Sequence, residues 1–144
     1  IVSLFSKETS SLCYTRPLYK GNRMAYIDLT TKNLNETLDS NGIVIIDFWA
    51  EWCGPCRQFA PIFEEASEKF PDVTFAKVNT EEQQAIASQY GIQSIPTIMV
   101  VRDGIILMNQ PGSLPEEAFA KLIDHVKELD MDQIREEIAK EENE

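Results

Sequence analysis

The chain has 144 residues, enough for one ordinary domain with a single core and too few for a second full catalytic domain. Hydrophobic residues make up 43% and charged residues 26%, a composition that excludes a collagen-like, wholly disordered or disulfide-dense chain. The net charge of -11 repels phosphate backbones and anionic lipid headgroups, and the sequence has no apolar run of about 18 residues. We therefore expect neither a nucleic-acid nor a membrane partner.

The beginning of the chain differs in composition from its centre. Residues 1–23 contain four basic residues and one acid, and another six residues of this segment are Ser or Thr. They lack the unbroken apolar stretch of a secretory signal. We interpret them as sequence added by cloning, as upstream sequence or as a disordered leader, and we place the globular domain at residues 24–129.

The end of the chain is acidic. Residues 130–144 contain seven acids against two basic residues. Met131, Ile134 and Ile138 share one helical stripe, so a short and weakly packed helix is one interpretation. The other, which we favour, is a solvated acidic tail that frays, because three apolar side chains offer little surface to offset the entropy of ordering the segment.

Between these ends, strand and helix patterns alternate in the order βαβαβαββα. Strands are expected at residues 26–29, Ile43–Trp49, 73–78, 97–101 and 105–108, and helices near 34–41, 53–70, 81–90 and 115–126. Ile43–Trp49 is β-branched and aromatic without polar alternation, which indicates a central strand covered on both faces. Asp103-Gly104 favours a tight hairpin before the last strand. The fold class is therefore α/β, with a mixed central sheet flanked by helices on both faces.

The strongest chemical signal is a pair of cysteines, Cys53 and Cys56, at the predicted start of the long helix. Backbone N–H groups and the helix dipole favour a thiolate there, and we expect the pKa of Cys53 to fall from about 8.5 to about 7. Cys56 lies one turn on and can attack a sulfur bonded to Cys53. Trp52, Gly54 and Pro55 complete a stiff active-site loop in which we expect Cys53 to be accessible.

Two alternatives compete with a redox role for this pair. A zinc site needs about four ligands, and beyond the pair the chain offers only Cys13 in the leader and His125 on the last helix. We therefore expect no metal. Buried inert cysteines are the other alternative, but the Trp, Gly and Pro beside them favour a loop over a core.

The motif and several shorter segments together resemble the thioredoxin family over roughly residues 26–128. The matching segments are Asp47-Phe48-Trp49-Ala50-Glu51-Trp52-Cys53-Gly54-Pro55-Cys56, Ala60-Pro61-Ile62, Ala76-Lys77-Val78-Asn79, Tyr90-Gly91-Ile92, Ile95-Pro96-Thr97, Asp103-Gly104 and Gly112. The resemblance implies the thioredoxin fold and a cytoplasmic, monomeric dithiol–disulfide oxidoreductase that reduces disulfide-bearing proteins. It further implies that the chain binds no cofactor of its own and that thioredoxin reductase, a flavoprotein, recharges it from NADPH.

The resemblance also suggests roles for residues outside the cysteine motif. Asp47 lies inside a strand that otherwise predicts burial, which would raise its pKa and make it a proton acceptor for Cys56. Lys77 is either an ordinary lysine at a sheet margin or, by resemblance, reaches toward Asp47 and modulates it. Pro96 is either a trans turn proline or, as in the family, a cis proline facing the disulfide. With Ile95 and Gly112 it would border the substrate groove.

Two other function classes stay open at this stage. An oxidase or isomerase would favour a secretory signal and a different dipeptide between the cysteines. A binding module, in which the acidic tail contacts a basic partner, would not need the intact Cys-Gly-Pro-Cys sequence. We therefore favour a protein-disulfide reductase that acts in cell redox homeostasis.

Overall fold

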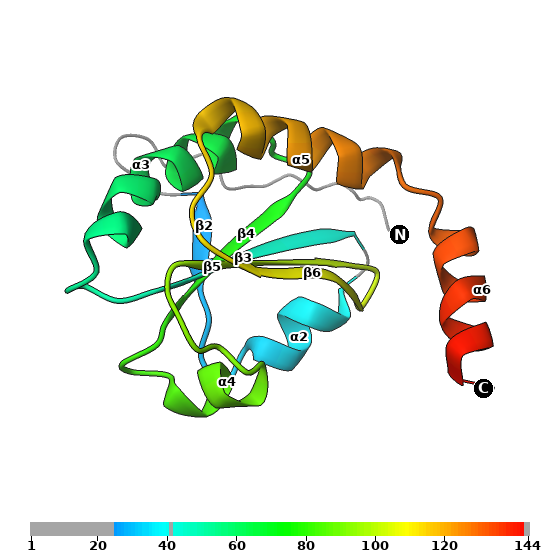
Figure 1. Ribbon diagram of the computed structural model, residues 1–144, viewed down its shortest axis with the longest axis horizontal. Helices are drawn as coiled ribbons and strands as arrows, with labels where there is room; N and C mark the ends of the chain where they lie inside the picture. The colour runs from blue at the N-terminus through cyan, green and yellow to red at the C-terminus, as the bar shows by residue number, and fades with distance from the viewer. Residues whose placement is uncertain (1–24, 41, 143–144) are drawn as a thin grey trace, which may run out of the picture.

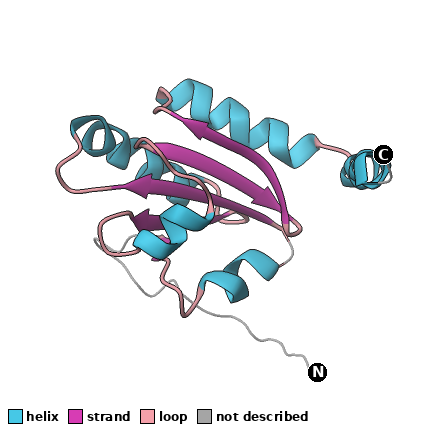
Figure 2. Ribbon diagram, turned by 60° about the horizontal axis from the view of Figure 1, so that its bottom comes forward, coloured by secondary structure: helices cyan, strands magenta, loops and turns pink. Residues whose placement is uncertain are grey.

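The computed structural model describes residues 25–40 and 42–142, and it has a central five-stranded sheet between two layers of helices (Figures 1 and 2). The strands are β2 (Tyr26–Asp28), β3 (Ile43–Trp49), β4 (Thr74–Asn79), β5 (Thr97–Arg102) and β6 (Ile105–Pro111). The helices are α2 (Leu34–Asp39), α3 (Gly54–Lys69), α4 (Gln84–Gln89), α5 (Glu116–Glu128) and α6 (Met131–Glu142). The expected order of elements and the α/β fold class are confirmed.

The sheet is mixed and runs in the order β2-β4-β3-β5-β6. The β2, β4 and β3 strands are parallel, β5 pairs antiparallel with β3, and β6 pairs antiparallel with β5. Helices α3 and α5 cover one face of the sheet, and α2 and α4 cover the other (Figure 1). The central position predicted for β3 is confirmed, because it pairs on both sides and six of its seven residues are buried.

Side-chain alternation along β3 divides the core between the two faces of the sheet. Ile43 and Ile45 pack with the phenylalanines of α3 and α5, whereas Val44, Ile46 and Phe48 pack on the opposite side. The same alternation sends Asp47 toward the α3 face. A carboxyl group thus stands where the preceding alternate residues are isoleucines.

Some helices and strands begin or end at other residues than predicted, because side-chain hydrogen bonds and turns set their ends. The helix expected at 81–90 begins only at Gln84, because the Asn79 side chain accepts hydrogen bonds from the N–H groups of Glu81 and Glu82 in a preceding turn. Asp103 and Gly104 both have positive φ, 54° and 81°, as the hairpin requires. β6 then extends three residues beyond the predicted 105–108.

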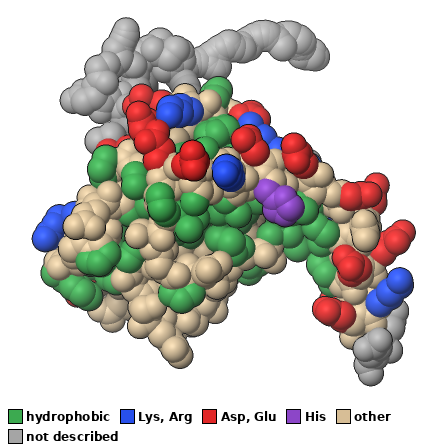
Figure 3. Space-filling model, turned by 45° about the horizontal axis from the view of Figure 1, so that its top comes forward, with side chains coloured by type: hydrophobic (Ala, Val, Ile, Leu, Met, Phe, Trp, Pro, Cys, Tyr) green, Lys and Arg blue, Asp and Glu red, His purple; other side chains and the backbone are tan. Residues whose placement is uncertain are grey.

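The preference for a fraying acidic tail is wrong for the described part of that segment, because residues 131–142 form the helix α6. The Asp130 carboxylate accepts hydrogen bonds from the N–H groups of Asp132 and Gln133, which caps the helix. Met131 is buried, and Arg135 forms an ion pair with Asp103 at 3.2 Å. In Figure 3, α6 forms a lobe beside the domain with acidic side chains on its surface.

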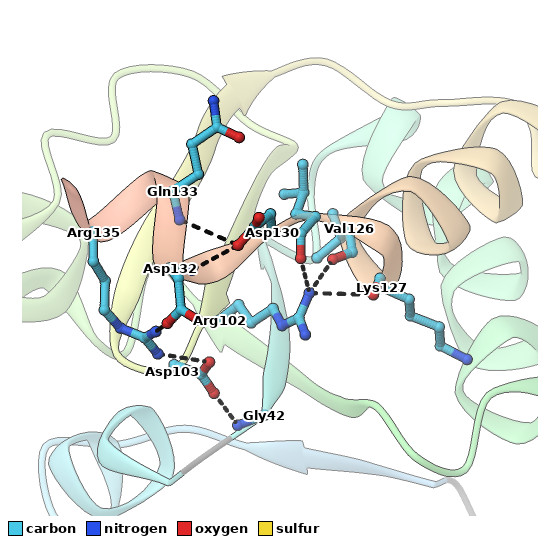
Figure 4. A network of polar contacts seen from close by, with 10 residues as sticks. Gly42, Arg102, Asp103, Val126, Lys127, Asp130, Asp132, Gln133 and Arg135 are labelled. Atoms are coloured by element: carbon cyan, nitrogen blue, oxygen red, sulfur yellow. Dashed lines mark hydrogen bonds and ion pairs between the residues drawn. The ribbon is translucent and has the colours of Figure 1, made fainter. Parts of the chain in front are cut away.

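Side chains at the hairpin between β5 and β6 contact the end of α5, the helix α6 and the residue before β3 (Figure 4). One guanidinium nitrogen of Arg102 donates to the carbonyl oxygens of Val126, Lys127 and Leu129 at 2.7, 3.3 and 3.3 Å. These carbonyls lie at the C-terminal end of α5, where the helix itself offers no partner. The hairpin therefore fixes the end of α5 before the chain enters α6.

No helix within the described ranges is long and apolar enough to cross a membrane. The leader that was assigned to residues 1–23 lies outside the described residues, and so does Cys13. The proposed domain boundaries and the monomeric state stay predictions.

Candidate active site

The two motif cysteines form a disulfide at the N-terminus of α3. Cys53 is the N-cap residue in an extended conformation, and its Sγ accepts a hydrogen bond from the N–H of Cys56 at 3.2 Å. Pro55 occupies the first turn, where its missing N–H costs no helical hydrogen bond. A free N–H donor and the helix dipole thus stabilise negative charge on the Cys53 sulfur whenever the disulfide is reduced.

The expectation that Cys53 is accessible is wrong for the disulfide form. Cys53 is 4% exposed and Cys56 is 2% exposed, whereas the neighbouring Trp52 is 66% exposed. The loop before β5 covers the sulfur, because the carbonyl oxygen of Ile95 lies 3.8 Å from Cys53 Sγ. The motif therefore presents an exposed indole at the surface, whereas both of its cysteines are buried.

The covering loop contains a cis peptide bond between Ile95 and Pro96, as the resemblance implied. Pro96 is buried and Ile95 is half-buried. The N–H of Gly112 donates to the carbonyl oxygen of Pro96 at 2.8 Å, and Gly112 has a φ of 106°, a conformation that favours glycine. The structure therefore brings all three predicted groove residues to the loop beside the disulfide.

Asp47 is fully buried under α3, and neither of its carboxylate oxygens has a hydrogen-bonding partner within the described ranges. Burial raises the pKa of Asp47 from its ordinary value of 3.8 to about 7. The positive charge of Lys77 opposes this rise and the negative charge of Glu64 adds to it. A carboxyl group with a pKa near neutrality can exchange protons at physiological pH.

Of the two interpretations of Lys77, the ordinary lysine at a sheet margin is wrong. It is not a partly solvated lysine at a sheet margin, because β2 pairs outside β4 and leaves Lys77 only 5% exposed. Lys77 is the register partner of Asp47 and its positive charge lowers the pKa of that carboxyl, but the two side chains form no ion pair. The Lys77 ammonium lies 3.8 Å from a Glu64 carboxylate oxygen instead, and 5.0 and 4.9 Å from the ring centres of Tyr26 and Trp49.

Sequence reasoning missed Glu64 and Tyr26. Glu64 follows the buried Phe63 and resembles any other polar residue on an amphipathic helix, and Tyr26 stands out only as part of a short strand. What joins them to Lys77 is the pairing of β2 with β4 and the position of α3 over that pair. The helical pattern around Glu64 and the short strand that contains Tyr26 do not identify these two residues as neighbours of Lys77 unless the strand order is known.

The comparisons agree with this geometry. The thioredoxin family model matches residues 25–125. The chain belongs to the thioredoxin family. Among its relatives are thioredoxin 1 of Synechococcus elongatus, 45% identical over 69% of this chain and 92% of that protein, and the thioredoxin of Bacillus subtilis, 38% identical over 69% and 96%. The solved structure of a mutant thioredoxin from Halobacterium salinarum superposes with a TM-score of 0.67 at 33% identity, over 72% of this chain and 92% of that one.

Family membership and the disulfide at the motif cysteines together establish the chemistry. The protein is a thiol–disulfide oxidoreductase of the thioredoxin type, and its activity is the reduction of protein disulfides. Its substrates are accordingly proteins that carry disulfides. The disulfide between Cys53 and Cys56 is the oxidised form of the dithiol that carries out this reduction.

Proposed function

We propose that the reduced protein acts through Cys53 as nucleophile and Cys56 as resolving thiol. The Cys53 thiolate attacks one sulfur of a substrate disulfide, forms a mixed disulfide and releases the other substrate sulfur as a thiolate. Cys56 then attacks Cys53 Sγ, which frees the second substrate thiol and leaves the Cys53–Cys56 disulfide. Two electrons pass from the protein dithiol to the substrate.

Asp47 accepts the proton of the Cys56 thiol before the second step. Its burial on the α3 side and its pKa of about 7 support this role, because α3 carries Cys56 in its first turn on the same side of the sheet. The side of the disulfide bordered by Ile95, Pro96 and Gly112 receives the substrate chain. Trp52, the exposed residue of the motif, contacts the substrate from the opposite side of Cys53.

The cycle closes when thioredoxin reductase returns two electrons from NADPH to the disulfide. The chain needs no cofactor of its own for these steps, because the electrons reside in the two sulfur atoms. We place this cycle in the cytoplasm, in electron transport that maintains cell redox homeostasis. The observation that supports the proposal best is the disulfide at the N-terminus of α3, against the cis-proline loop.

Reduction of insulin by NADPH and thioredoxin reductase tests this function. The wild-type protein is expected to sustain NADPH oxidation and insulin precipitation, whereas Cys53→Ser is expected to be inactive. The variants are made in a Cys13→Ser background, which is expected to be as active as the wild type and removes the third thiol. If the wild type is inactive with NADPH and thioredoxin reductase although dithiothreitol reduces its disulfide, recharge by this reductase is excluded.

Non-reducing gels with a disulfide substrate test the order of the two cysteines. Cys56→Ser is expected to accumulate a substrate adduct on Cys53, because only the second attack is removed. Cys53→Ser is expected to accumulate none. Equal adducts on both variants, or adducts on Cys56 alone, would overturn the assignment.

A further inference from the structure

The surroundings of the Lys77 ammonium differ from those of a simple partner of Asp47. Register places Asp47 and Lys77 side by side on neighbouring parallel strands, with both side chains on the face that α3 covers. Yet the ammonium lies near Glu64, at 3.8 Å, and over the rings of Tyr26 and Trp49. Each of these three groups attracts a cation. Together they compete for the ammonium with the carboxyl group of Asp47, with which Lys77 forms no ion pair.

Glu64 is the only one of the charged groups in this set that reaches solvent appreciably. Its side chain is 29% exposed, whereas the side chain of Lys77 is 6% exposed and Asp47 is fully buried. At 3.8 Å the contact with Lys77 is an electrostatic attraction longer than an ordinary hydrogen bond. A lysine side chain has four flexible carbons, so its ammonium can move when this attraction is removed without unfolding the strand.

The charged groups that act on Asp47 come from two elements, and a third element contributes through Lys77. Lys77 of β4 favours the ionised carboxylate, and Glu64 of α3 disfavours it. Tyr26 of β2 also contacts the ammonium, and its own pKa is raised by burial, by Glu64 and by Asp28, so it stays neutral in the working range. The protonation equilibrium of Asp47 therefore depends on the position of the positive charge of Lys77.

We propose that Glu64 is a positioning residue for proton transfer: it holds the Lys77 ammonium away from Asp47 and thereby sets the pH range in which Asp47 takes up and releases a proton. The inference rests on the proposed role of Asp47 as proton acceptor. Loss of the Glu64 charge acts twice in the same direction. It removes a negative charge that disfavours the ionised carboxylate, and it frees the ammonium to approach that carboxylate.

Titration of the Asp47 carboxyl by carbon-13 NMR, in the oxidised full-length protein, measures this effect directly. Glu64→Gln is expected to move the titration midpoint down by about one pH unit. Glu64→Asp keeps the charge on a shorter side chain, and its midpoint is expected to lie between those of the wild type and the glutamine variant. Glu68→Gln is the matched control, because it removes the same charge one turn further along α3, and its midpoint is expected to stay near that of the wild type.

A second background separates positioning from the direct effect of the charge. In Lys77→Met no ammonium is left to move, so Glu64→Gln is expected to shift the Asp47 midpoint by less than half as much as it does in the wild type. An equal shift in both backgrounds would show that Glu64 does not act through Lys77 and would overturn the proposal. An unchanged midpoint in Glu64→Gln, or one shifted equally by Glu68→Gln, would overturn it as well.

The pH profile of insulin reduction connects the titration to the reaction. The acid limb for Glu64→Gln is expected to move to lower pH by the same amount as the NMR midpoint. If the wild type and Asp47→Asn share one pH profile, the proton-acceptor role of Asp47 fails and the kinetic part of the proposal fails with it. The NMR comparison still decides whether Glu64 controls the position of Lys77.

Discussion

Two aspartates at opposite ends of β3 and β5 show contrasting uses of a carboxylate. Asp103, at the hairpin, uses both oxygens: Oδ1 accepts from the N–H of Gly42 at 2.9 Å and Oδ2 pairs with Arg135 at 3.2 Å (Figure 4). Asp47 lies in the interior, and neither of its oxygens has a partner in the described part of the chain. A carboxylate with satisfied oxygens stabilises structure, whereas an unpaired buried carboxylate costs stability and gains a pKa suited to proton transfer.

The two basic residues beside these aspartates repeat the contrast. Arg102 directs one guanidinium nitrogen at three carbonyl oxygens and so closes the end of α5. Within the described residues the Lys77 side chain makes no hydrogen bond as close as these, and two rings and one carboxylate hold it at longer range. The hairpin end is therefore fixed by short, directed contacts. The Asp47 end depends on charges whose balance can change with pH or mutation.

Asp47→Asn is expected to produce the largest change in stability. Because the pKa of Asp47 is about 7 in the folded protein and 3.8 ordinarily, the folded state binds a proton that the unfolded state has lost between these values. Stability of the wild type therefore falls as pH rises through that window, by up to about 4 kcal/mol at pH 8. The variant lacks this decline, so its stability relative to the wild type is expected to grow from pH 4 to pH 8.

Urea unfolding of the oxidised wild type and variant at several pH values measures that difference, and a difference independent of pH would contradict the raised pKa. The same variant is expected to reduce insulin more slowly near pH 7, by about one to two orders of magnitude. Unchanged rates between pH 6 and pH 8 would exclude Asp47 as the proton acceptor.

Arg102→Met is expected to lower stability and leave the chemistry intact. The substitution keeps an apolar stem of similar length but removes the charged donor from the end of α5, at a cost of about 1–3 kcal/mol. Arg102→Lys keeps the positive charge without the planar guanidinium, and its loss is expected to be smaller. Urea midpoints and insulin reduction below the unfolding transition check both effects. A variant with normal stability and impaired turnover would show that the hairpin end takes part in catalysis.

The features that the sequence predicts are those carried by local patterns, and those that it does not predict depend on contacts between distant segments. The order of elements, the central β3 and the Cys53–Cys56 site could be predicted, because periodicity and a local motif carry them. The surroundings of Lys77 could not, since they depend on β2 pairing outside β4. The sequence analysis offered the α6 helix only as the less favoured interpretation, because one of its anchors, Asp103, lies 32 residues from Arg135 in sequence. Contacts between distant segments leave no local pattern.

Removal of residues 130–144 is expected to have a moderate effect on stability and none on turnover. The truncated chain loses the buried Met131 and the ion pair of Arg135, but it keeps Leu129 and with it the contacts of Arg102. We expect a loss of about 2 kcal/mol in the free energy of unfolding, set mainly by one methionine side chain. Insulin reduction is expected to stay within about twofold of the wild type. If the truncated protein is folded but has lost most of its activity, the acidic helix has a role in function.

Asp103→Asn is expected to have the smallest effect, because it separates the two bonds of that carboxylate. Asparagine keeps an oxygen for the N–H of Gly42 and tolerates the positive φ of 54°, but it loses the ion pair with the half-exposed Arg135. Such a pair contributes at most about 1 kcal/mol. The same substitution in the chain truncated before Asp130 is expected to cost nothing further, because Arg135 is already absent. An equal cost in both chains, measured by urea unfolding, would show that Asp103 stabilises the hairpin without α6 and that Met131 alone anchors the helix.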